Sequence, residues 1–234
     1  MTAVFTAEGL SVRYGGLHAL EGASIELEPG KVHGVIGPNG AGKSTFIDAL
    51  SGRRRPSSGT VVYDGVDVTK QSVGWRRRHG IARSFQRASV FPGLTVRTQL
   101  EMASHRTGER DLDSIVAALA LGDVLDSVCS ELPYGTQRLV DLALALVGGP
   151  RVVLLDEPCA GLVADESFQM LEHVRTLTTE RGLAVLLVEH DVEGVFRVCD
   201  RITVLNLGTV LMSDDPAVVR KDPAVVKAYL GSAA

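Results

Sequence analysis

The feature that most constrains this chain is the pattern G-x-x-x-x-G-K-[ST], which lies between a run typical of a buried strand and a segment typical of a helix. The run is residues 32–36 and the helical segment is residues 44–50. Glycines in such a loop let successive main-chain N–H groups point inward around phosphate oxygens, and the helix dipole adds positive potential there. The pattern predicts a nucleotide phosphate site formed by Gly37, Pro38, Asn39, Gly40, Ala41, Gly42, Lys43, Ser44 and Thr45.

Two side chains of this loop have distinct expected roles. The ammonium group of Lys43 is expected to bridge the β- and γ-phosphates, and the hydroxyl of Ser44 is expected to bind Mg²⁺. A glycine-rich turn without a ligand is the alternative reading, but the flanking strand and helix favour nucleotide binding.

A second apolar strand, residues 152–155, ends abruptly in two carboxylates, Asp156 and Glu157. This arrangement places acids at the carboxyl edge of a sheet, beside a bound phosphate. Asp156 is suited to hold Mg²⁺ through water. Glu157 can accept a proton from the water that attacks the γ-phosphorus if it lies within hydrogen-bonding reach. The alternative is an exposed acidic strand end.

A third apolar strand, residues 184–188, precedes His190 and places an imidazole at the same predicted edge. His190 is expected to bind the γ-phosphate and to help position the attacking water. Gln86 follows a short strand-like run, but a glutamine by itself indicates no function.

Composition restricts the class of protein and its partners. A chain of 234 residues with a net charge of -4 can form one large α/β domain, and it has no overall electrostatic attraction for nucleic acid or an anionic membrane. Two arginine triplets, residues 53–55 and 76–78, are expected to be solvated faces more often than phosphate, lipid or acidic-partner sites. The three cysteines are widely spaced, which favours a reduced cytosolic chain, and neither a signal peptide nor a membrane-spanning segment is predicted.

The order of predicted elements indicates an α/β fold. Early segments, residues 4–12 and 23–27, alternate as half-buried antiparallel strands do. Residues 94–126 change to helical spacing without a convincing strand, which predicts a helical insert. Alternating helices and strands from residue 136 to 205 then indicate a parallel sheet covered by helices.

These motifs, in this order, resemble the ATP-binding subunit of an ABC transporter over essentially the whole chain. The motifs are Tyr14, the phosphate loop 37–45, Phe85-Gln86, the signature-like segment 132–137, Asp156-Glu157 and His190. The resemblance implies a P-loop NTPase fold with an N-terminal antiparallel β subdomain. It further implies a single ABC ATPase domain, residues 1–234, whose RecA-like core carries an inserted helical subdomain with the signature segment at approximately residues 87–147.

The resemblance also implies roles for individual residues, with ATP and Mg²⁺ as cofactors. Tyr14 would stack on adenine, and Gln86 would contact Mg²⁺, sense the γ-phosphate and relay to the helical subdomain. Glu157, His190, Lys43 and Gln86 would then be the catalytic set, and Ser44, Gln86 and Asp156 the metal-binding set. The partner's nucleotide would be bound by the signature residues Pro133, Tyr134, Gly135, Thr136 and Gln137.

Within the family, the chain is most similar to importer ATPases for branched-chain amino acids and related compounds, as in Arg83-Ser84-Phe85-Gln86 and the ending Ala228-Tyr229-Leu230-Gly231. Such importers imply a second ATPase subunit, preferably different, two membrane permeases and an external binding protein, with this chain at the cytoplasmic face of the membrane. Phe91 is expected either in a permease contact or in the core. An ATPase of a lipid exporter and a largely non-hydrolytic regulatory subunit stay open as alternatives.

Several residues depart from the family pattern. Pro133 replaces a common serine, and proline offers neither a hydroxyl nor an N–H. Thr136 replaces glutamine, Leu144 replaces arginine, and Ala164 replaces proline. Because the signature segment serves the opposite nucleotide, we expect an asymmetric pair in which this chain supplies one competent catalytic half-site.

Overall fold

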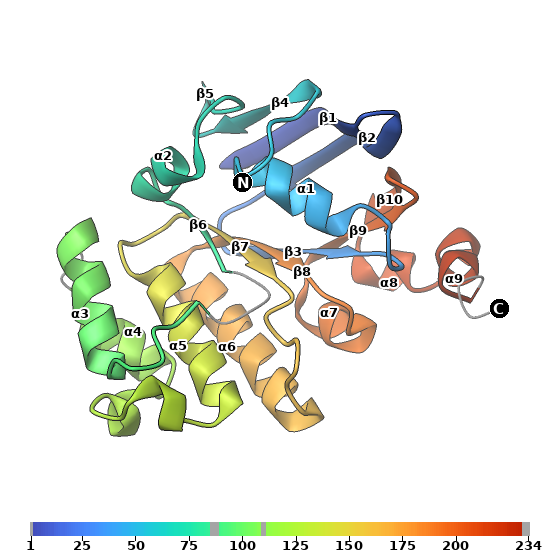
Figure 1. The fold of residues 1–234 in the computed structure, drawn as a ribbon. Coiled ribbons are helices and arrows are strands. Elements are labelled where there is room, and N and C mark those ends of the chain that lie inside the picture. Colours follow the sequence, from blue (N-terminus) through green and yellow to red (C-terminus); the bar gives the residue numbers. More distant parts are fainter. Residues whose placement is uncertain (1, 85–88, 109–110, 231–234) are drawn as a thin grey trace.

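The computed structural model describes residues 2–84, 89–108 and 111–230, and it contains two sheets (Figure 1). The larger sheet is six-stranded, in the order β10-β9-β3-β8-β7-β6. Its strands are β3 (Lys31–Ile36), β6 (Ile81–Arg83), β7 (Val152–Asp156), β8 (Ala184–Val188), β9 (Arg201–Asn206) and β10 (Thr209–Asp214). All pairs are parallel except β9 with β10.

The central strands are continuous apolar runs because helices cover both faces of the sheet. Every residue of β7 and β8 is buried, as expected for strands that have no solvent face. Asp156, the last residue of β7, pairs with Val188, the last residue of β8, and Val188 pairs with Val35 of β3. This register brings the loops that follow β3, β7 and β8 to one edge.

The smaller sheet is antiparallel, in the order β2-β1-β4-β5. Its strands are β1 (Phe5–Tyr14), β2 (Leu17–Leu27), β4 (Ser58–Tyr63) and β5 (Val66–Asp67). Helix α1 (Lys43–Leu50) lies between the two sheets (Figure 1). Its buried residues Phe46 and Ile47 share one apolar cluster with Leu10 of the small sheet and Leu186 of the large one.

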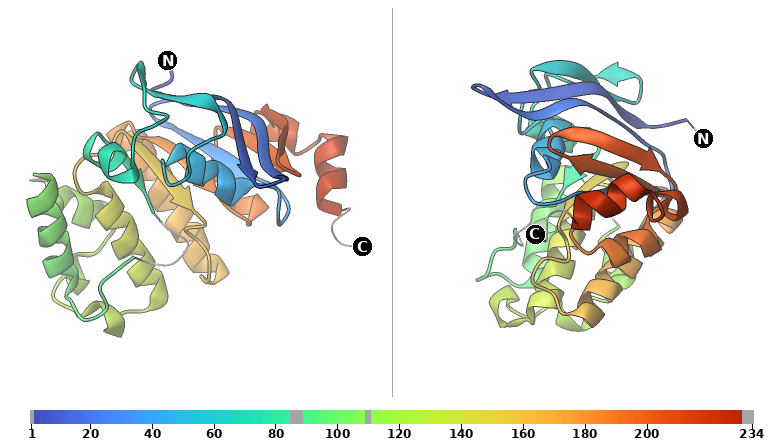
Figure 2. Two further views of the ribbon diagram at one scale, coloured as in Figure 1. Left: turned by 45° about the horizontal axis from the view of Figure 1, so that its top comes forward. Right: turned by 90° about the vertical axis from the view of Figure 1, so that its right-hand side faces the viewer.

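The opposite face of the large sheet is covered by α5 (Tyr134–Leu146), α6 (Ala164–Arg181) and α7 (Val192–Val198), which share a second apolar cluster with β7 and β8. Helices α3 (Val96–Thr107) and α4 (Leu112–Ala118) lie beside α5 on one side of the molecule (Figure 2). Two short 3-10 turns, Gly122–Val124 and Cys129–Glu131, complete this helical region. The remaining helices are α2 (Val73–Arg78), α8 (Pro216–Val219) and α9 (Pro223–Leu230).

The fold class and the N-terminal antiparallel sheet are confirmed, and the bounds of the helical subdomain stay a prediction. Among the described residues from 89 to 147, secondary structure is helical apart from an isolated bridge between Thr95 and Val128.

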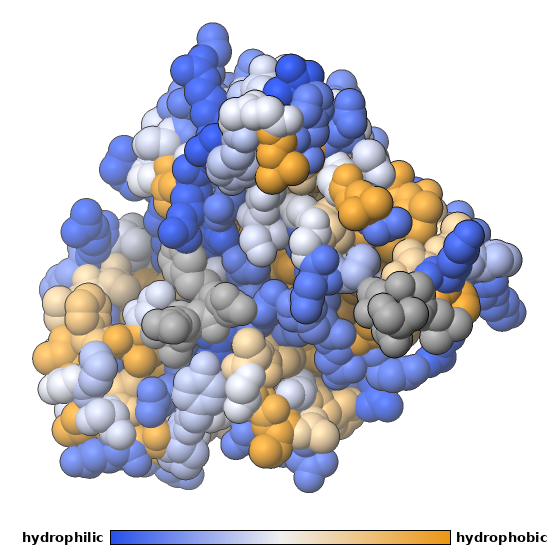
Figure 3. Space-filling view, turned by 45° about the vertical axis from the view of Figure 1, so that its right-hand side comes forward, coloured by the Kyte–Doolittle hydropathy of each residue, from blue (hydrophilic) through white to orange (hydrophobic). Residues whose placement is uncertain are grey.

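No helix within the described ranges combines the length and apolar character needed to span a membrane. The face in Figure 3 is largely hydrophilic, and its apolar side chains form several separate groups.

One expectation is wrong, and one of two alternatives is excluded. Arg76 is not part of a solvated face, because its side chain is 1% exposed and donates to the main-chain carbonyls of Leu50 and Val68. Burial lowers the pKa of Arg76 to about 10. Phe91 does not lie in the core, since it is 60% exposed. The arginine therefore fastens α2 to the end of α1, and the phenylalanine is available for contact with another molecule.

Candidate active site

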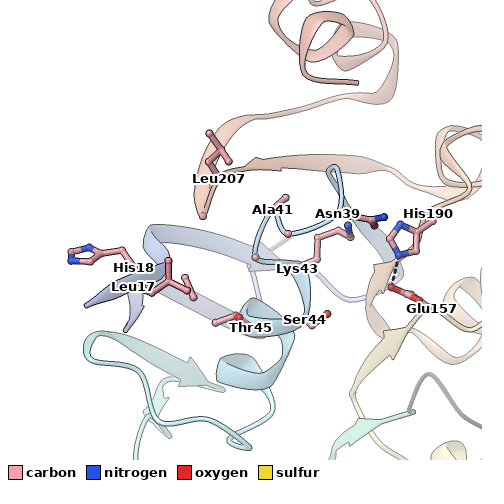
Figure 4. Close-up of a pocket in the computed structure, with 14 residues that line it drawn as sticks. Leu17, His18, Asn39, Ala41, Lys43, Ser44, Thr45, Glu157, His190 and Leu207 are labelled. Carbon is pink, nitrogen blue, oxygen red and sulfur yellow. Dashed lines mark ion pairs between the residues drawn. The ribbon is translucent and has the colours of Figure 1, made fainter. Parts of the chain in front are cut away.

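A cavity of ≈ 560 Å³ opens at the carboxyl edge of the large sheet, and its size lies within the range of about 300–1,000 Å³ usual for small-molecule sites. Figure 4 shows how its lining side chains lie along its length. Glu157 and His190 lie at one end, Lys43 and Ser44 lie in the middle, and Leu17 lies toward the other end (Figure 4). The described residues that line it are Leu17, His18, Ala19, Asn39, Gly40, Ala41, Gly42, Lys43, Ser44, Thr45, Glu157, His190, Leu207 and Gly208.

The phosphate loop needs glycine at two points where the chain passes close to neighbouring main chain. Gly42 has a φ of 101°, and a Cβ there would lie 2.7 Å from the carbonyl oxygen of Ala19. A Cβ at Gly37 would overlap the carbonyl oxygen of Leu205. The loop then enters α1 with Gly42 as the residue before the first helical turn. The main chains of β2 and β9 therefore lie too close to the loop for a side chain at either glycine.

Lys43 points back across its own loop. Its Nζ donates to the carbonyl oxygens of Gly37 at 2.7 Å and Pro38 at 3.1 Å, and the side chain is buried. Burial lowers the pKa of Lys43, while the charge of Glu157 opposes that shift. The ammonium group is thus held inside the cavity, where an anion of higher charge density can replace the weak carbonyl acceptors.

Glu157 and His190 meet across the end of the cavity. Glu157 Oε1 lies 2.6 Å from His190 Nε2, and the side chains are 11% and 47% exposed. Glu157 adopts a φ of 51°, which is uncommon for a residue other than glycine. Its main-chain N–H donates to Val188 at 2.8 Å, so the turn after β7 is fastened to the end of β8. The structure brings together a carboxylate that can accept a proton and an imidazole that can orient it.

Asp156 makes a contact that sequence reasoning missed. One carboxylate oxygen accepts from Arg83 at 2.7 Å, and the same guanidinium donates to Asp48 at 2.6 Å and to Ser51 at 2.8 Å. This cation ties β7 to β6 and to the end of α1. Sequence analysis named Arg83 only as part of a family likeness, since an arginine in a strand has no distinctive pattern.

The oxygen donors near the loop fit a magnesium ion. Mg²⁺ prefers oxygen ligands and is usually held by one or two protein groups together with water and substrate phosphates. The exposed hydroxyl of Ser44 and the carboxylate of Asp156 belong to that type. Within the described ranges no cluster of three or more His, Cys, Asp or Glu side chains could hold a metal ion. Gln86, the third expected ligand, lies outside the described residues.

Tyr14 does not line the cavity. It is 43% exposed, and the guanidinium of Arg54 lies 4.2 Å above the centre of its ring. The cavity wall at this end is formed instead by Leu17 and Leu207, which are 66% and 84% exposed. Leu207 belongs to the β9–β10 turn, more than 150 positions after the phosphate loop. In the sequence, only the turn-forming residues Asn206 and Gly208 distinguish this segment, and they indicate no binding function.

The signature residues of this chain lie apart from the cavity. Pro133, Tyr134, Gly135, Thr136 and Gln137 stand at and just inside the start of α5, and Tyr134 is 43% exposed. A Cβ at Gly135 would lie 2.8 Å from Glu166 Oε1, so the first turn of α6 packs closely on this helix start. One chain therefore places its phosphate loop and its signature segment at separate positions.

Comparison with known proteins agrees with this geometry. Residues 20–160 match the family described as ABC transporter, and residues 209–234 match one described as branched-chain amino acid ATP-binding cassette transporter. The chain therefore belongs to the ABC transporter family and is one of its ATP-hydrolysing subunits.

Two relatives are similar over almost their full length. The high-affinity branched-chain amino acid transport ATP-binding protein BraF of Pseudomonas aeruginosa is 32% identical, with 98% of each chain covered. LivG of Escherichia coli, which carries the same description, is 33% identical with the same coverage. The resemblance stated from the motifs is confirmed.

Solved structures agree as well. An ATP-binding cassette of an ABC transporter in its ADP conformation superposes with a TM-score of 0.89 at 28% identity, covering 99% of this chain and 100% of the other. A nucleotide-free ATP-binding cassette superposes with a TM-score of 0.87 at 27% identity, covering 97% and 99%.

Proposed function

We propose that this chain is the ATP-hydrolysing motor subunit of an importer for branched-chain amino acids or related small polar compounds. The observation that carries the catalytic part is the contact of 2.6 Å between Glu157 and His190 at the end of the phosphate cavity. The descriptions of BraF and LivG support the class of cargo. Cargo contacts belong to other subunits, so they have no counterpart among the residues of this chain.

In the proposed mechanism, ATP lies along the cavity with its triphosphate over the start of α1. The loop N–H groups and Lys43 would hold the β- and γ-phosphates. Ser44 and Asp156 would hold Mg²⁺, which when bound would supply positive charge to offset that of the phosphate oxygens. Glu157 accepts the proton of the attacking water. His190 orients that carboxylate and binds the γ-phosphate.

Adenine binding is proposed at the other end of the cavity. Tyr14 lies outside the cavity lining but pairs with the lining residue Leu17 across the β1–β2 turn, so its ring offers an aromatic face for stacking beside this end. Arg54 covers one side of that ring. Leu17 and Leu207 add apolar walls without hydrogen-bond donors. Such a pocket favours ATP through stacking and burial, with little selection between purine bases.

The second nucleotide is proposed to lie between two subunits. The segment 133–137 would face the partner's γ-phosphate. Gln86 would sense the γ-phosphate bound to this chain's own loop and relay its presence to the helical subdomain. Pro133 has no hydroxyl, so the partner's site lacks a donor that a serine supplies. We therefore propose a heterodimer with one fully competent site in preference to a homodimer, in which both sites would lack this donor.

The C-terminal segment also reaches the nucleotide site. Tyr229 of α9 packs against the apolar cluster that contains Ile36, and its phenol shares a hydrogen bond with the main chain of Gly37. Burial raises the pKa of Tyr229 to about 12. Tyr229 thus supports the first residue of the phosphate loop. The match of residues 209–234 to the branched-chain amino acid family favours this subfamily over the lipid-exporter alternative.

The remaining proposed partners are two membrane permeases and an external substrate-binding protein, with this chain at the cytoplasmic face of the membrane. Phe91 is exposed at the start of the helical region, next to Pro92. A permease loop that docks there would connect transport to ATP hydrolysis. Replacing Phe91 with Ala should uncouple transport while ATP turnover continues.

The test uses the complex purified through this chain and reconstituted in vesicles. Glu157→Gln in this chain should lower the ATP turnover number by about 10²- to 10⁴-fold, the usual contribution of a general base, while ATP binding persists. Glu172→Gln, an exposed position of α6, is the matched control. Unchanged turnover in the Glu157 variant would contradict the catalytic assignment.

Two further results distinguish the alternatives. ATP-dependent uptake of radiolabelled leucine, with the binding protein present, would support the importer. ATP-dependent export of lipid from the vesicles would instead support the lipid-exporter alternative. Negligible turnover in the unmodified complex would favour a regulatory subunit.

A further inference from the structure

The turn that carries the proposed catalytic base is held by two buried charged side chains of opposite sign. Arg138 of α5 donates through Nη2 to the carbonyl of Glu157 at 2.8 Å and through Nε to the carbonyl of Pro158 at 3.0 Å. Glu189 accepts the N–H of Cys159 at 2.7 Å through Oε1. Consecutive main-chain groups of residues 157–159 are thus bound by a cation on one side and an anion on the other.

Glu189 also binds the loop of the proposed catalytic histidine. Its Oε2 accepts the main-chain N–H of His190 at 3.1 Å. The two oxygens of one carboxylate therefore bridge the turn after β7 and the loop after β8. One end of this bridge is His190 itself and the other is two residues after Glu157, the two residues whose side chains meet at 2.6 Å.

Both charged groups lie where an isolated ion is costly. Arg138 is 2% exposed and Glu189 is 3% exposed. Burial raises the pKa of Glu189, and the nearby charge of Glu157 adds to that effect, whereas the two N–H donors oppose it. Asp141, which lies 4.0 Å from the Arg138 guanidinium, is also buried. In some proteins such buried ions fix one geometry and contribute little to stability.

We propose that Arg138 and Glu189 are positioning residues that hold the Glu157 carboxylate against His190 through the main chain of residues 157–159. This inference rests on the proposed function of Glu157 and His190. Glu157 has a φ of 51°, a conformation that persists only when the surrounding structure imposes it. The two buried ions supply that constraint from both sides of the turn.

The arrangement also connects this site to the signature segment. Arg138 follows that segment directly on α5, and Asp141 on the same helix accepts the main-chain N–H of Ser89 at 2.9 Å. Because Arg138 is bonded to the carbonyls of Glu157 and Pro158, a displacement of α5 would also displace these main-chain groups. Through this side chain, the helix that faces the partner's nucleotide influences the geometry of the base on this chain.

The decisive experiment is Glu189→Gln in the purified complex. Glutamine keeps the size but replaces one acceptor oxygen with an NH₂ group, which then faces a main-chain N–H. We expect the turnover number to fall by about 10- to 100-fold, the effect of displacing a catalytic group by about 1 Å. The ATP dissociation constant should stay unchanged, since Glu189 does not line the cavity. Glu172→Gln on the exposed face of α6 is the control.

A double-mutant cycle with His190→Ala separates positioning from general destabilisation. If Glu189 acts through the Glu157–His190 contact, the change to glutamine should have little further effect once His190 is absent. Additive losses, or unchanged turnover in the single variant, would overturn the proposal. Arg138→Lys, which keeps the charge but cannot reach both carbonyls in the same geometry, should lower turnover in the same way. This variant decides the question if the glutamine variant does not fold.

A failure of the proposed function can be distinguished from a failure of the positioning role. If Glu157→Gln and His190→Ala leave turnover unchanged, the catalytic assignment is wrong. If both lower turnover and neither the Glu189 nor the Arg138 variant does, only the positioning role is wrong.

Discussion

His33 makes the stability of this protein depend on pH in a defined window. It lies in β3, the strand that leads into the phosphate loop, and is 4% exposed. Its Nδ1 lies 3.0 Å from the carbonyl of Glu26, and its Nε2 lies 2.8 Å from the hydroxyl of Thr203. Because a carbonyl only accepts, Nδ1 donates to Glu26, and in the neutral ring Nε2 accepts from the hydroxyl of Thr203, which can donate or accept. Burial is what favours this neutral form.

Burial lowers the pKa of His33 from 6.5 to about 4. The hydrogen bond to the carbonyl of Glu26 opposes this shift, and the positive charge of Arg201 adds to it. Between these values the unfolded chain binds a proton that the folded chain does not bind. Stability therefore falls as pH decreases from about 6.5 to about 4, and this residue adds no further loss below that. At about 1.4 kcal/mol per pKa unit, the full loss is about 3 kcal/mol.

The assay is urea unfolding of the unmodified chain and of His33→Asn. The free energy of unfolding is measured at intervals between about pH 7.5 and about pH 4, the range in which the binding of one proton to His33 changes it. The variant should be less stable at neutral pH, and the difference from the unmodified chain should shrink as pH falls. Carboxylates titrate in both proteins and cancel in that difference. A difference that stays constant across the window would refute the assignment of a neutral buried imidazole.

Three further predictions concern single positions. Arg76→Gln should destabilise the chain by about 2–4 kcal/mol because buried carbonyls lose their donors, whereas the exposed Arg78→Gln should change stability by less than about 0.5 kcal/mol, as urea unfolding would show. Leu207→Asn should stabilise the chain by about 1 kcal/mol in thermal unfolding, because Leu207 has a φ of 47° in a two-residue hairpin turn where asparagine is favoured; a lower melting temperature would contradict this. Gly42→Ala should weaken ATP binding in calorimetry more than Gly40→Ala, since only at Gly42 would a Cβ meet the main chain of β2, and equal losses would count against this steric argument.

The elements that the sequence predicted well are those with a repeating pattern or a local turn signal. Strand β8 begins and ends at the predicted residues 184 and 188, because a parallel strand covered by helices on both faces is a continuous apolar run. The prolines at 216 and 223 begin α8 and α9, because proline is favoured at the first helical position. Local chemistry was sufficient in each case.

The contacts that the sequence did not predict join segments far apart in the chain. Arg83 reaches Asp156 across 73 positions, and Arg138 reaches the carbonyls after β7 from a different helix. Side-chain bonds to main-chain carbonyls leave no periodic pattern, because every residue carries the same acceptor. The burial of Arg76 escaped sequence reasoning for the same reason, since three consecutive arginines have the composition of a solvated face.

The amino-acid sequence alone determined that this chain binds a nucleotide phosphate, because glycine spacing, a lysine and a helix start are local requirements of one loop. It also identified the acidic end of β7 and His190 as chemically suited residues. Only the tertiary structure decided that Glu157 and His190 meet at 2.6 Å and that Arg138 and Glu189 hold the turn between them. The reason is that such distances depend on the register of parallel strands and on which helix packs over them, and both are set by the burial of apolar surface across the whole chain.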